Sequence, residues 1–392
     1  MLICLLKTQA RIDLLFYSLQ MRKVKSIGAA LLVTAGVIYL VSIGNAKPLA
    51  PALKVGVLVS DSGALSFAGP IQRAAAKMAA IDQATEGTPV KVELSFADVG
   101  DTEAESKRAV SKLRALGVDV LIAPIESDSA EVLLTSNNKQ QLPTISTAPL
   151  ADDLGDKNTK AWHFRLATSP SQDSFALAKF IDKTNPGGVL VVSGAHPQNR
   201  EQLKSLSLGL IFNGLRVQTA GIKDVKAIAK AKPDALVLLS MEESLGFFGA
   251  LADWVVDVPQ VYLVPSNLGD YSSYLWAKSL KGAQALSPKH KIDPELRTDL
   301  AKELGNLSLV GPRSVTLLTL AQRTVEAIQL AADAVRQAKS DSPEKLRQAL
   351  ASSKVRGKDL FTEDGFLEQR EYSVLRYGST GTFSQGSIFS PN

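Results

Sequence analysis

Cysteine is nearly absent from this chain: 392 residues contain one, Cys4. Because Cys4 precedes an apolar run at residues 27–43, everything after that run lacks a thiol. This excludes disulfide bonds and thiolate catalysis from the main part of the chain, so a hydrophobic core must supply its stability. It also excludes lipid attachment through a cysteine directly after the apolar run.

Histidine is scarce as well, with three residues at positions 163, 196 and 290. None has a second histidine or a cysteine at ligand spacing, which argues against the common metal sites. We interpret His163 and His290 as structural or solvated side chains; the same interpretation fits His196, which directly follows a strand and stays a candidate. Gly63 lacks the partner glycines of nucleotide-binding loops, and the G-x-S-x-G motif of hydrolases is absent. The sequence therefore predicts no cofactor, no metal and no enzymatic activity.

An excess of charge of one sign is missing from most of the chain. The formal net charge is +5, but residues 1–46 hold five basic side chains and one acidic one. The rest carries 39 basic and 38 acidic side chains, so the pI near 9.0 reflects the N-terminal segment. A nearly neutral body does not suit a polyphosphate partner, and we expect no nucleic-acid binding.

The N-terminal segment has the pattern of an export signal. A basic stretch at residues 22–25 precedes the uncharged run Ile27–Ile43, and small residues lead to a possible cleavage site after Ala46. At 17 residues the run also approaches the length of a membrane-spanning helix. An uncleaved anchor, with membrane contact at about residues 22–43 only, is therefore the alternative. Either interpretation places the remainder of the chain in the periplasm or another extracytoplasmic space. Met21 is a second candidate for the first residue of the protein.

Strand and helix patterns alternate through the rest of the chain. Lys54–Val59 has the composition of a strand buried on both faces, and apolar residues recur at helical spacing over Pro70–Ala84. Further strands are expected at 90–97, 118–124, 142–148, 162–166, 188–193, 217–220, 235–240, 260–265 and 372–377. Further helices are expected at 102–116, 170–185, 199–213, 244–255, 294–304, 313–339 and 342–352. This order predicts an α/β fold with two Rossmann-like lobes, each a parallel sheet flanked by helices.

The two runs of strands set the expected domain boundaries. We assign residues 1–46 to the signal peptide or anchor. Lobe I is expected to comprise 52–166 plus about 287–340, and lobe II 167–286 plus about 341–392.

Polar residues follow the strands at the points where these lead into helices. In an open α/β sheet this carboxyl edge is where ligands bind. The candidate ligand-binding residues of lobe I are Ser62, Ser66, Phe67, Ser127, Asp128, Ser129, Thr147 and Ala148. Those of lobe II are His196, Glu242, Ser266 and Asn267. Each alone also fits ordinary helix capping, and Glu242 also fits a charge that complements a helix dipole. Together they predict a cleft.

Four segments, in order, resemble the type I periplasmic solute-binding proteins of ABC importers, in particular the leucine/isoleucine/valine-binding branch. They are LKVGVLVSDSGALSFAG at 53–69, PTISTAPLADDL at 143–154, FRLATSPSQDS at 164–174 and KGAQALSP at 281–288. The resemblance implies two Rossmann-like lobes joined by three crossover segments that close on a solute by hinge motion. It also implies an ABC permease as partner.

The resemblance further implies individual roles. Ser127, with its neighbour Ser129, maps onto the serine turn that holds a ligand carboxylate. Ala148 and Leu150 map onto the positions that offer a carbonyl and a hydroxyl to a ligand ammonium. Leucine has no hydroxyl, so the chain departs from the family at this position.

A second departure concerns the ammonium partner. Ser266 stands where branched-chain amino-acid binders place an acid. A buried ammonium without a carboxylate is strongly unfavourable. Either Glu242 or Asp128 replaces that acid, or the ligand is not an α-amino acid.

We therefore expect a monomeric extracytoplasmic protein that captures a small polar metabolite, such as an amino acid or a related compound, in an interlobe cleft and delivers it to an ABC permease. The alternative is a membrane-tethered binding or sensory module that uses the same fold without transport. The weakened amino-acid site and the possible anchor favour this alternative, whereas the order of the lobes fits both.

Overall fold

The computed structural model describes most of the chain from residue 52 to residue 391. Outside the described residues lie 1–51, 64, 86–88, 138–140, 153, 155–160, 195–196, 222, 225–227, 229, 240–257, 265–279, 290–291, 306–313, 356–357, 363–364, 368–370, 379–382 and 392. The chain divides into Met1–Leu49 and Ala50–Asn392, and only the second unit contains described residues. The predictions for the export signal therefore lie outside them. Within the described residues, no helix combines the length and apolar character needed to cross a bilayer.

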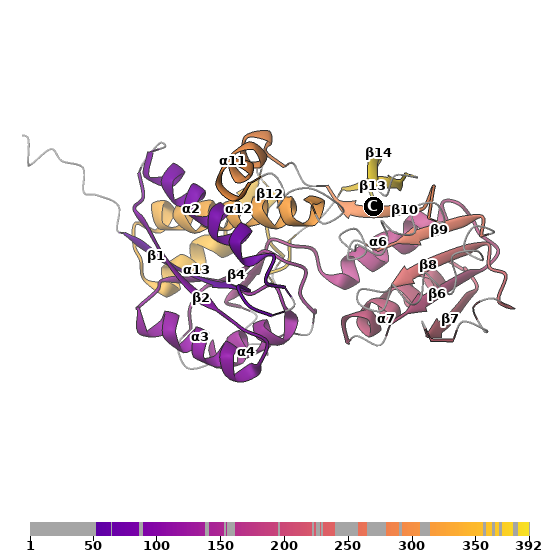
Figure 1. Cartoon of the computed structure of the whole chain (residues 1–392), viewed down its shortest axis with the longest axis horizontal. Coiled ribbons are helices and arrows are strands. Elements are labelled where there is room, and N and C mark those ends of the chain that lie inside the picture. The colour runs from indigo at the N-terminus through magenta and orange to yellow at the C-terminus, as the bar shows by residue number, and fades with distance from the viewer. Residues whose placement is uncertain are drawn as a thin grey trace, which may run out of the picture. The chain divides into compact units, whose positions relative to one another are not determined.

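The first sheet is built around β1, the strand that the LKVGVLV run predicts. Its five parallel strands follow the order β2-β1-β3-β4-β5. They are β1 Leu53–Val59, β2 Val92–Asp98, β3 Val120–Ile122, β4 Thr144–Ser146 and β5 His163–Arg165. All residues of β1 except Lys54 are buried, because helices cover both faces of the sheet (Figure 1). The carboxyl ends of all five strands meet at one edge, where the candidate residues of lobe I lie.

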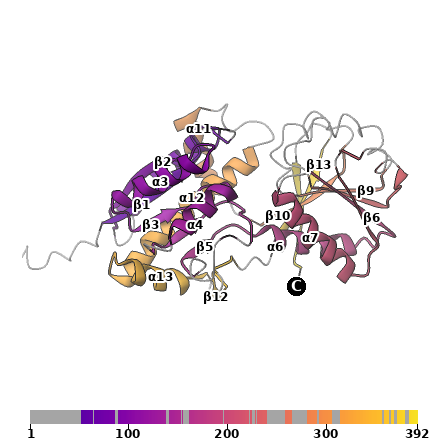
Figure 2. The same cartoon turned by 90° about the horizontal axis from the view of Figure 1, so that it is seen from below.

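Two groups of helices enclose this sheet and form the first lobe with it. Val55 and Val57 face a core that contains residues of α2 Gly69–Thr85, α11 Pro294–Leu304, α12 Ser314–Ala338 and α13 Pro343–Ala351. Leu58 faces a core with residues of α3 Glu103–Ala115 and α4 Ser127–Asn137. Figure 2 shows the lobe from below.

Helix α13 corrects the predicted boundary of lobe II at about residue 341. Leu346 and Leu350 of this helix are fully buried in the core of the first lobe, together with Val335 of α12. The apolar residues of α13 recur at spacings of three and four, so the helix needs a partner for one stripe, and it packs on α12 immediately before it. Phe361 belongs to the same core, so the first lobe extends past residue 341. The remaining boundaries stay a prediction.

The second sheet has seven strands in the order β14-β13-β10-β9-β8-β6-β7. They are β6 Val189–Ser193, β7 Val217–Gly221, β8 Ala235–Leu239, β9 Gln260–Leu263, β10 Gln284–Pro288, β13 Tyr372–Tyr377 and β14 Phe383–Phe389. Strands β6 to β10 are parallel, but β13 runs antiparallel to β10 and β14 antiparallel to β13. The expectation of a purely parallel sheet is therefore wrong at this edge. The connection between β13 and β14 is too short for a parallel crossover.

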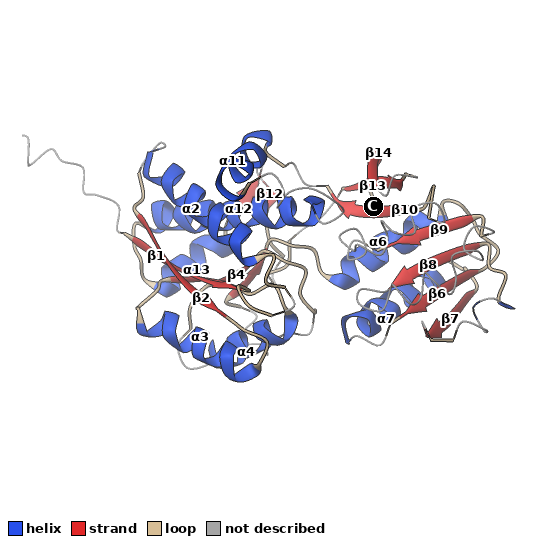
Figure 3. Ribbon diagram, in the orientation of Figure 1, coloured by secondary structure: helices blue, strands red, loops and turns tan. Residues whose placement is uncertain are grey.

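Helices α6 Pro170–Asp182 and α7 Pro197–Phe212 pack on the second sheet and form the second lobe with it (Figure 3). Ser169 caps α6: its side chain accepts a hydrogen bond from the backbone N–H of Gln172, whose side chain reaches back to the backbone N–H of Ser169. A two-stranded ribbon, β11 Lys354–Val355 and β12 Lys358–Asp359, follows α13.

Asp173, in the first turn of α6, lies in a buried polar cluster at the start of the second lobe. Its Oδ2 accepts a hydrogen bond from Thr168 Oγ1 at 3.0 Å, and its Oδ1 accepts one from Tyr372 Oη at 3.2 Å. Burial is the main cause that raises the pKa of Asp173 from 3.8 to about 7, and the negative charge of Asp152 also raises it. The two hydroxyl donors and the positive charge of the buried Arg323 on α12 lower this pKa but do not offset the effect of burial. The cluster therefore joins the segment before α6, the first strand residue of β13 and helix α12.

The raised pKa of Asp173 predicts a distinct pH dependence of stability. The folded state holds the proton more tightly than the unfolded chain, so this contribution is complete below about pH 4 and is lost as the pH rises through about 7. Asp173→Asn cannot ionise. The stability of wild type minus that of Asp173→Asn should therefore fall between pH 4 and pH 8, by roughly 4 kcal/mol at most.

Urea unfolding of both proteins across this range measures the difference. Asp182→Asn, at the less buried end of the same helix, is the matched control. A difference that is constant with pH, or that grows as the pH rises, contradicts the assignment.

Candidate functional site

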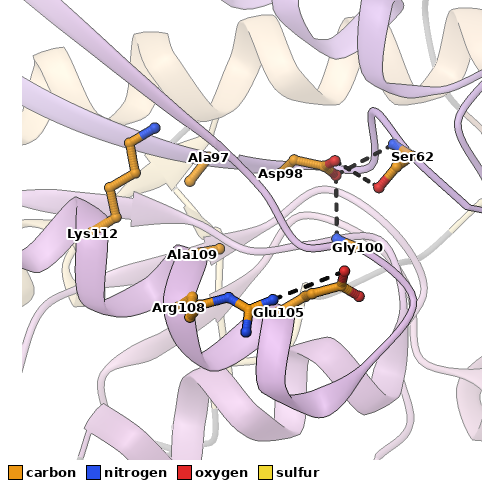
Figure 4. Close-up of a pocket in the computed structure, with 8 residues that line it drawn as sticks. All are labelled: Ser62, Ala97, Asp98, Gly100, Glu105, Arg108, Ala109 and Lys112. Carbon is orange, nitrogen blue, oxygen red and sulfur yellow. Dashed lines mark hydrogen bonds and ion pairs between the residues drawn. The ribbon is translucent and has the colours of Figure 1, made fainter.

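The turn after β1 is held in place by Asp98, the last residue of β2. Asp98 Oδ1 accepts hydrogen bonds from the backbone N–H groups of Asp61 at 3.0 Å and Gly100 at 3.2 Å, with a longer one from Ser62 at 3.4 Å. Its Oδ2 accepts a hydrogen bond from Ser62 Oγ at 2.6 Å (Figure 4). Partial burial opposes ionisation, but the hydrogen bonds from Ser62, Gly100 and Asp61 keep the pKa of Asp98 below its usual value. Ser62 is thus committed to shaping this turn.

Asp98 was not among the residues predicted from the sequence. Parallel pairing places Val59 opposite Asp98, so the acid stands beside the first free N–H groups after β1. An acidic residue at the end of a strand, directly before a Val-Gly turn, is the one signal that points to it. That signal can be interpreted only once the register of β1 and β2 is known.

Gly63 is required by the shape of the same turn. Its φ is +79°, and a Cβ at this position would lie 1.7 Å from Asp101 Oδ1. Ser66 continues the turn by donating its backbone N–H to the carbonyl of Gly63 at 3.2 Å. The half-buried Phe67 packs against the core of the first lobe. The predicted residues of this segment therefore lie in one turn, and Phe67 anchors it to the core.

Ser127, the first residue of α4, joins two of the predicted turns. Its Oγ accepts a hydrogen bond from the backbone N–H of Ala151 at 3.1 Å, which connects the turn after β3 to the segment after β4. A hydroxyl that accepts one bond still has its proton to donate. The first-turn N–H groups of a helix favour a negative charge at the same place. Ser127 and the start of α4 can therefore hold a carboxylate, with the exposed Asp128 next to it.

Ser129 faces away from this position. It is 8% exposed, its Oγ donates to Glu126 Oε2 at 3.2 Å, and Ser106 Oγ lies 3.1 Å from it. Burial raises the pKa of Glu126, the hydrogen bond from Ser129 lowers it, and nearby Asp101, Asp98 and Asp128 raise it further. The structure thus brings Ser127 and Ser129 onto one helix turn but gives their hydroxyls different partners.

The segment after β4 combines an unpaired hydroxyl with a firmly held backbone. Thr147 is 1% exposed, and its Oγ1 has no hydrogen-bond partner among the described residues. The half-buried Ala148 follows it. Leu150 is buried in the core beside α3 and α4. Arg165 Nη1 donates to the carbonyl of Ala151 at 2.7 Å and, more weakly, to that of Leu150 at 3.4 Å. Thr147 is therefore the polar group of this segment that a ligand could still satisfy.

His163 is a structural residue, as its position within a strand indicates. It is 2% exposed, and its Nε2 is hydrogen-bonded to Ser146 Oγ on the neighbouring strand. Burial and the nearby Arg165 lower its pKa to about 3, so the ring is neutral at physiological pH. The predictions for His196, Glu242, Ser266 and Asn267 fall outside the described residues.

A shallow hollow of about 300 Å³ lies between β2 and α3. Ser62 and Asp98 line one end, and Glu105, Arg108 and Lys112 of α3 line the rest (Figure 4). Arg108 pairs weakly with Glu105 at 4.0 Å, and both side chains are exposed. Of the predicted ligand-binding residues, this hollow includes Ser62 alone. Neither Ser127 nor Thr147 lines it.

Replacing Asp98 tests its role in the first turn. Asp98→Ala leaves the N–H groups of Asp61 and Gly100 without their acceptor, and we expect a loss of about 1–3 kcal/mol in the free energy of unfolding. Glu93→Ala on the same strand removes only an exposed pair with Lys91 and should cost less than about 1 kcal/mol. Urea unfolding measures both, and hydrogen exchange should increase at residues 60–63 in Asp98→Ala. Equal effects of the two substitutions contradict the role.

Solved structures share this fold. A leucine-binding protein, LivK, from Thermotoga maritima aligns with a TM-score of 0.70 at 13% identity, over 87% of this chain and 99% of that one. LivJ from Streptococcus pneumoniae, in complex with isoleucine, aligns with a TM-score of 0.69 at 14% identity, over 87% and 100%. A solute-binding protein from Rhodopseudomonas palustris BisB5, in complex with 3,4-dihydroxybenzoic acid, aligns with a TM-score of 0.70 at 15% identity, over 87% and 98%.

At these identities the likeness establishes the fold, which is that of the type I periplasmic binding proteins. A search of curated protein sequences gave no match. The family model described as "periplasmic binding protein" matches residues 52–374. This match covers the first sheet and the second sheet as far as the start of β13, and on this evidence the chain belongs to the periplasmic binding protein family.

Proposed function

We propose that this protein captures a small polar metabolite outside the cytoplasm, in a cleft between its lobes, and delivers it to an ABC permease. The family match over residues 52–374 and the likeness to solute-binding proteins of ABC transporters support this role. The observation that carries it is the pairing of Ser127 with Ala151, which gathers the turns after β3 and β4 at the carboxyl edge of the first sheet. The hydroxyl proton of Ser127 and the N–H groups at the start of α4 then favour a ligand that carries one anionic group.

The charges around this position favour a ligand that also carries a positive group. Asp98, Asp101 and Asp128 all act on Glu126, so the start of α4 lies in a negative field. A plain carboxylate is repelled by these acids, whereas an ammonium on the same ligand is attracted. Asp128 is exposed and adjacent to Ser127, which makes it our candidate for the ammonium partner. An amino acid or a related zwitterion therefore suits the first lobe better than an aromatic acid such as benzoate.

A membrane-tethered sensory or binding module is the second candidate function. One observation favours it: Leu150 stands where amino-acid binders offer a hydroxyl, and its side chain is buried in the core. The chain thus lacks one polar contact of those binders. Under this alternative, no solute that the permease transports is bound.

Substitution of Ser127 tests the proposed carboxylate contact. Ser127→Ala removes a hydrogen bond to a charged group, and we expect the dissociation constant for a bound amino acid to rise about 10–100-fold. Ser129→Ala should reduce stability but change affinity little, because Ser129 Oγ is engaged by Glu126 and Ser106. Calorimetric titration of the full chain against amino acids and aromatic acids measures both. A larger loss of affinity in Ser129→Ala than in Ser127→Ala refutes the assignment.

The unpaired hydroxyl of Thr147 gives a test with effects of opposite sign. Thr147→Val removes a buried polar atom that has no partner among the described residues, so the ligand-free protein should gain about 1 kcal/mol of stability. If the hydroxyl binds the ligand, affinity falls at the same time. Thermal unfolding with and without ligand separates the two effects. Lower stability of the ligand-free variant with unchanged affinity is the contrary outcome.

A flat thermal response of the wild-type protein over a broad library of amino acids, amides and short carboxylates supports the sensory or binding module instead.

A further inference from the structure

Four large apolar side chains are exposed on the outer side of α6 and α7. Phe175 and Leu208 are each 46% exposed, Ile211 is 58% exposed and Phe212 is 90% exposed. We call these four residues the apolar face. Only three other large apolar side chains in the described part of the chain are exposed, and none lies on α6 or α7. Exposed apolar residues are ordinary when scattered, but a cluster of this kind marks an interaction surface.

The two helices approach each other closely enough to make these residues one surface. A Cβ on Gly209 would lie 3.1 Å from Phe175 Cδ1 and 2.8 Å from Ala178 Cβ, so Phe175 lies directly over Gly209. Ser171 Oγ and Ser205 Oγ are 2.7 Å apart one turn earlier in both helices, which shows that the helices run side by side in the same direction.

The positions of the four residues along α7 follow from this pairing. Leu208, Ile211 and Phe212 follow at spacings of three and four residues along α7, so they share one stripe of the helix. The inner faces of the same helices supply other residues to the core of the second lobe. The apolar face is therefore not needed to bury the sheet.

Positive charge borders the apolar face on α7. Arg200 and Lys204 precede Leu208 on the same stripe of α7, and both are exposed. Lys179 of α6 and Lys183, the residue after this helix, are exposed too, and they contact the C-terminal segment: Lys179 Nζ donates to the carbonyl of Pro391 at 2.6 Å, and Lys183 Nζ lies over the ring of Phe389. Among acids with a described side chain, the accessible surface of the two helices carries only the half-buried Asp182, and the sequence of α7 contains one further acid, Glu201. The combination of phenylalanine and aliphatic side chains with a lysine and arginine border is that of helices that bind at a membrane surface.

We propose that the apolar face docks on an anionic lipid surface, with its four side chains at the level of the acyl chains and its basic border against the headgroups. A second copy of the chain fits less well, because packing two such faces brings like charges together. A protein partner needs a surface of matching shape. A lipid surface needs no matching shape to accept the side chains of two parallel helices. The proposal is independent of the identity of the solute, and it places the second lobe at the membrane in which an ABC permease resides.

The single cysteine of the chain makes a direct experiment possible. In a Cys4→Ser background, Ile211→Cys carries a fluorophore that reports a water-free environment, and the full chain is reconstituted with phosphatidylglycerol or phosphatidylcholine vesicles. Ile81→Cys on α2, at a side chain 64% exposed in the first lobe, is the matched control. We expect a several-fold increase in emission and quenching by spin-labelled lipid at position 211 with phosphatidylglycerol. The response should weaken with salt and with phosphatidylcholine, and position 81 should not respond.

A second variant separates docking from folding. Leu208→Ser with Phe212→Ser replaces two residues that are 46% and 90% exposed, so thermal unfolding should change little while the signal at position 211 is lost. The proposal is overturned if position 211 does not respond to either lipid, or if position 81 responds equally. It is also overturned if the signal grows with protein concentration without lipid, which indicates self-association, or if it requires an added acidic protein in place of lipid.

Discussion

The burial of β1 on both faces is the constraint on which the rest of the first lobe depends. A strand with apolar residues on both sides needs helices above and below the sheet, and α2 with α12 and α3 with α4 supply them. Parallel crossovers then bring the ends of all five strands to one edge. The polar turns therefore converge because the apolar strand forces the topology.

The turns at this edge are shaped by side chains that bind other parts of the protein. Asp98 organises the turn after β1, and Arg165 holds the carbonyl of Ala151. Among the described residues, the Ser127 hydroxyl then retains a proton to donate and Thr147 Oγ1 has no partner, and both lie at the same edge. This division between supporting and available groups is what a binding site needs before the ligand arrives, because a preformed site loses little entropy on binding.

Much of this architecture could be read from the sequence, since β1, α2 and α12 have strong apolar periodicity and end within one or two residues of their expected positions. Contacts between elements that are distant in the chain could not be predicted from the sequence. The periodicity of α13 shows that it needs a partner but not that the partner is α12, and the antiparallel pairing of β13 with β10 joins segments far apart in the chain. The roles of Asp98 and Ser129 depend on strand register and helix rotation, which local composition does not encode.

We propose that the carboxyl edge of the first sheet binds a zwitterionic solute through Ser127. Equilibrium dialysis of the full chain against a defined mixture of amino acids, amides and carboxylic acids, followed by mass spectrometry, tests it most directly. The account predicts that wild-type protein enriches one or a few zwitterionic solutes and that Ser127→Ala loses this enrichment while Ser129→Ala keeps it. Enrichment of no solute, or of a plain carboxylate unaffected by Ser127→Ala, would contradict the account.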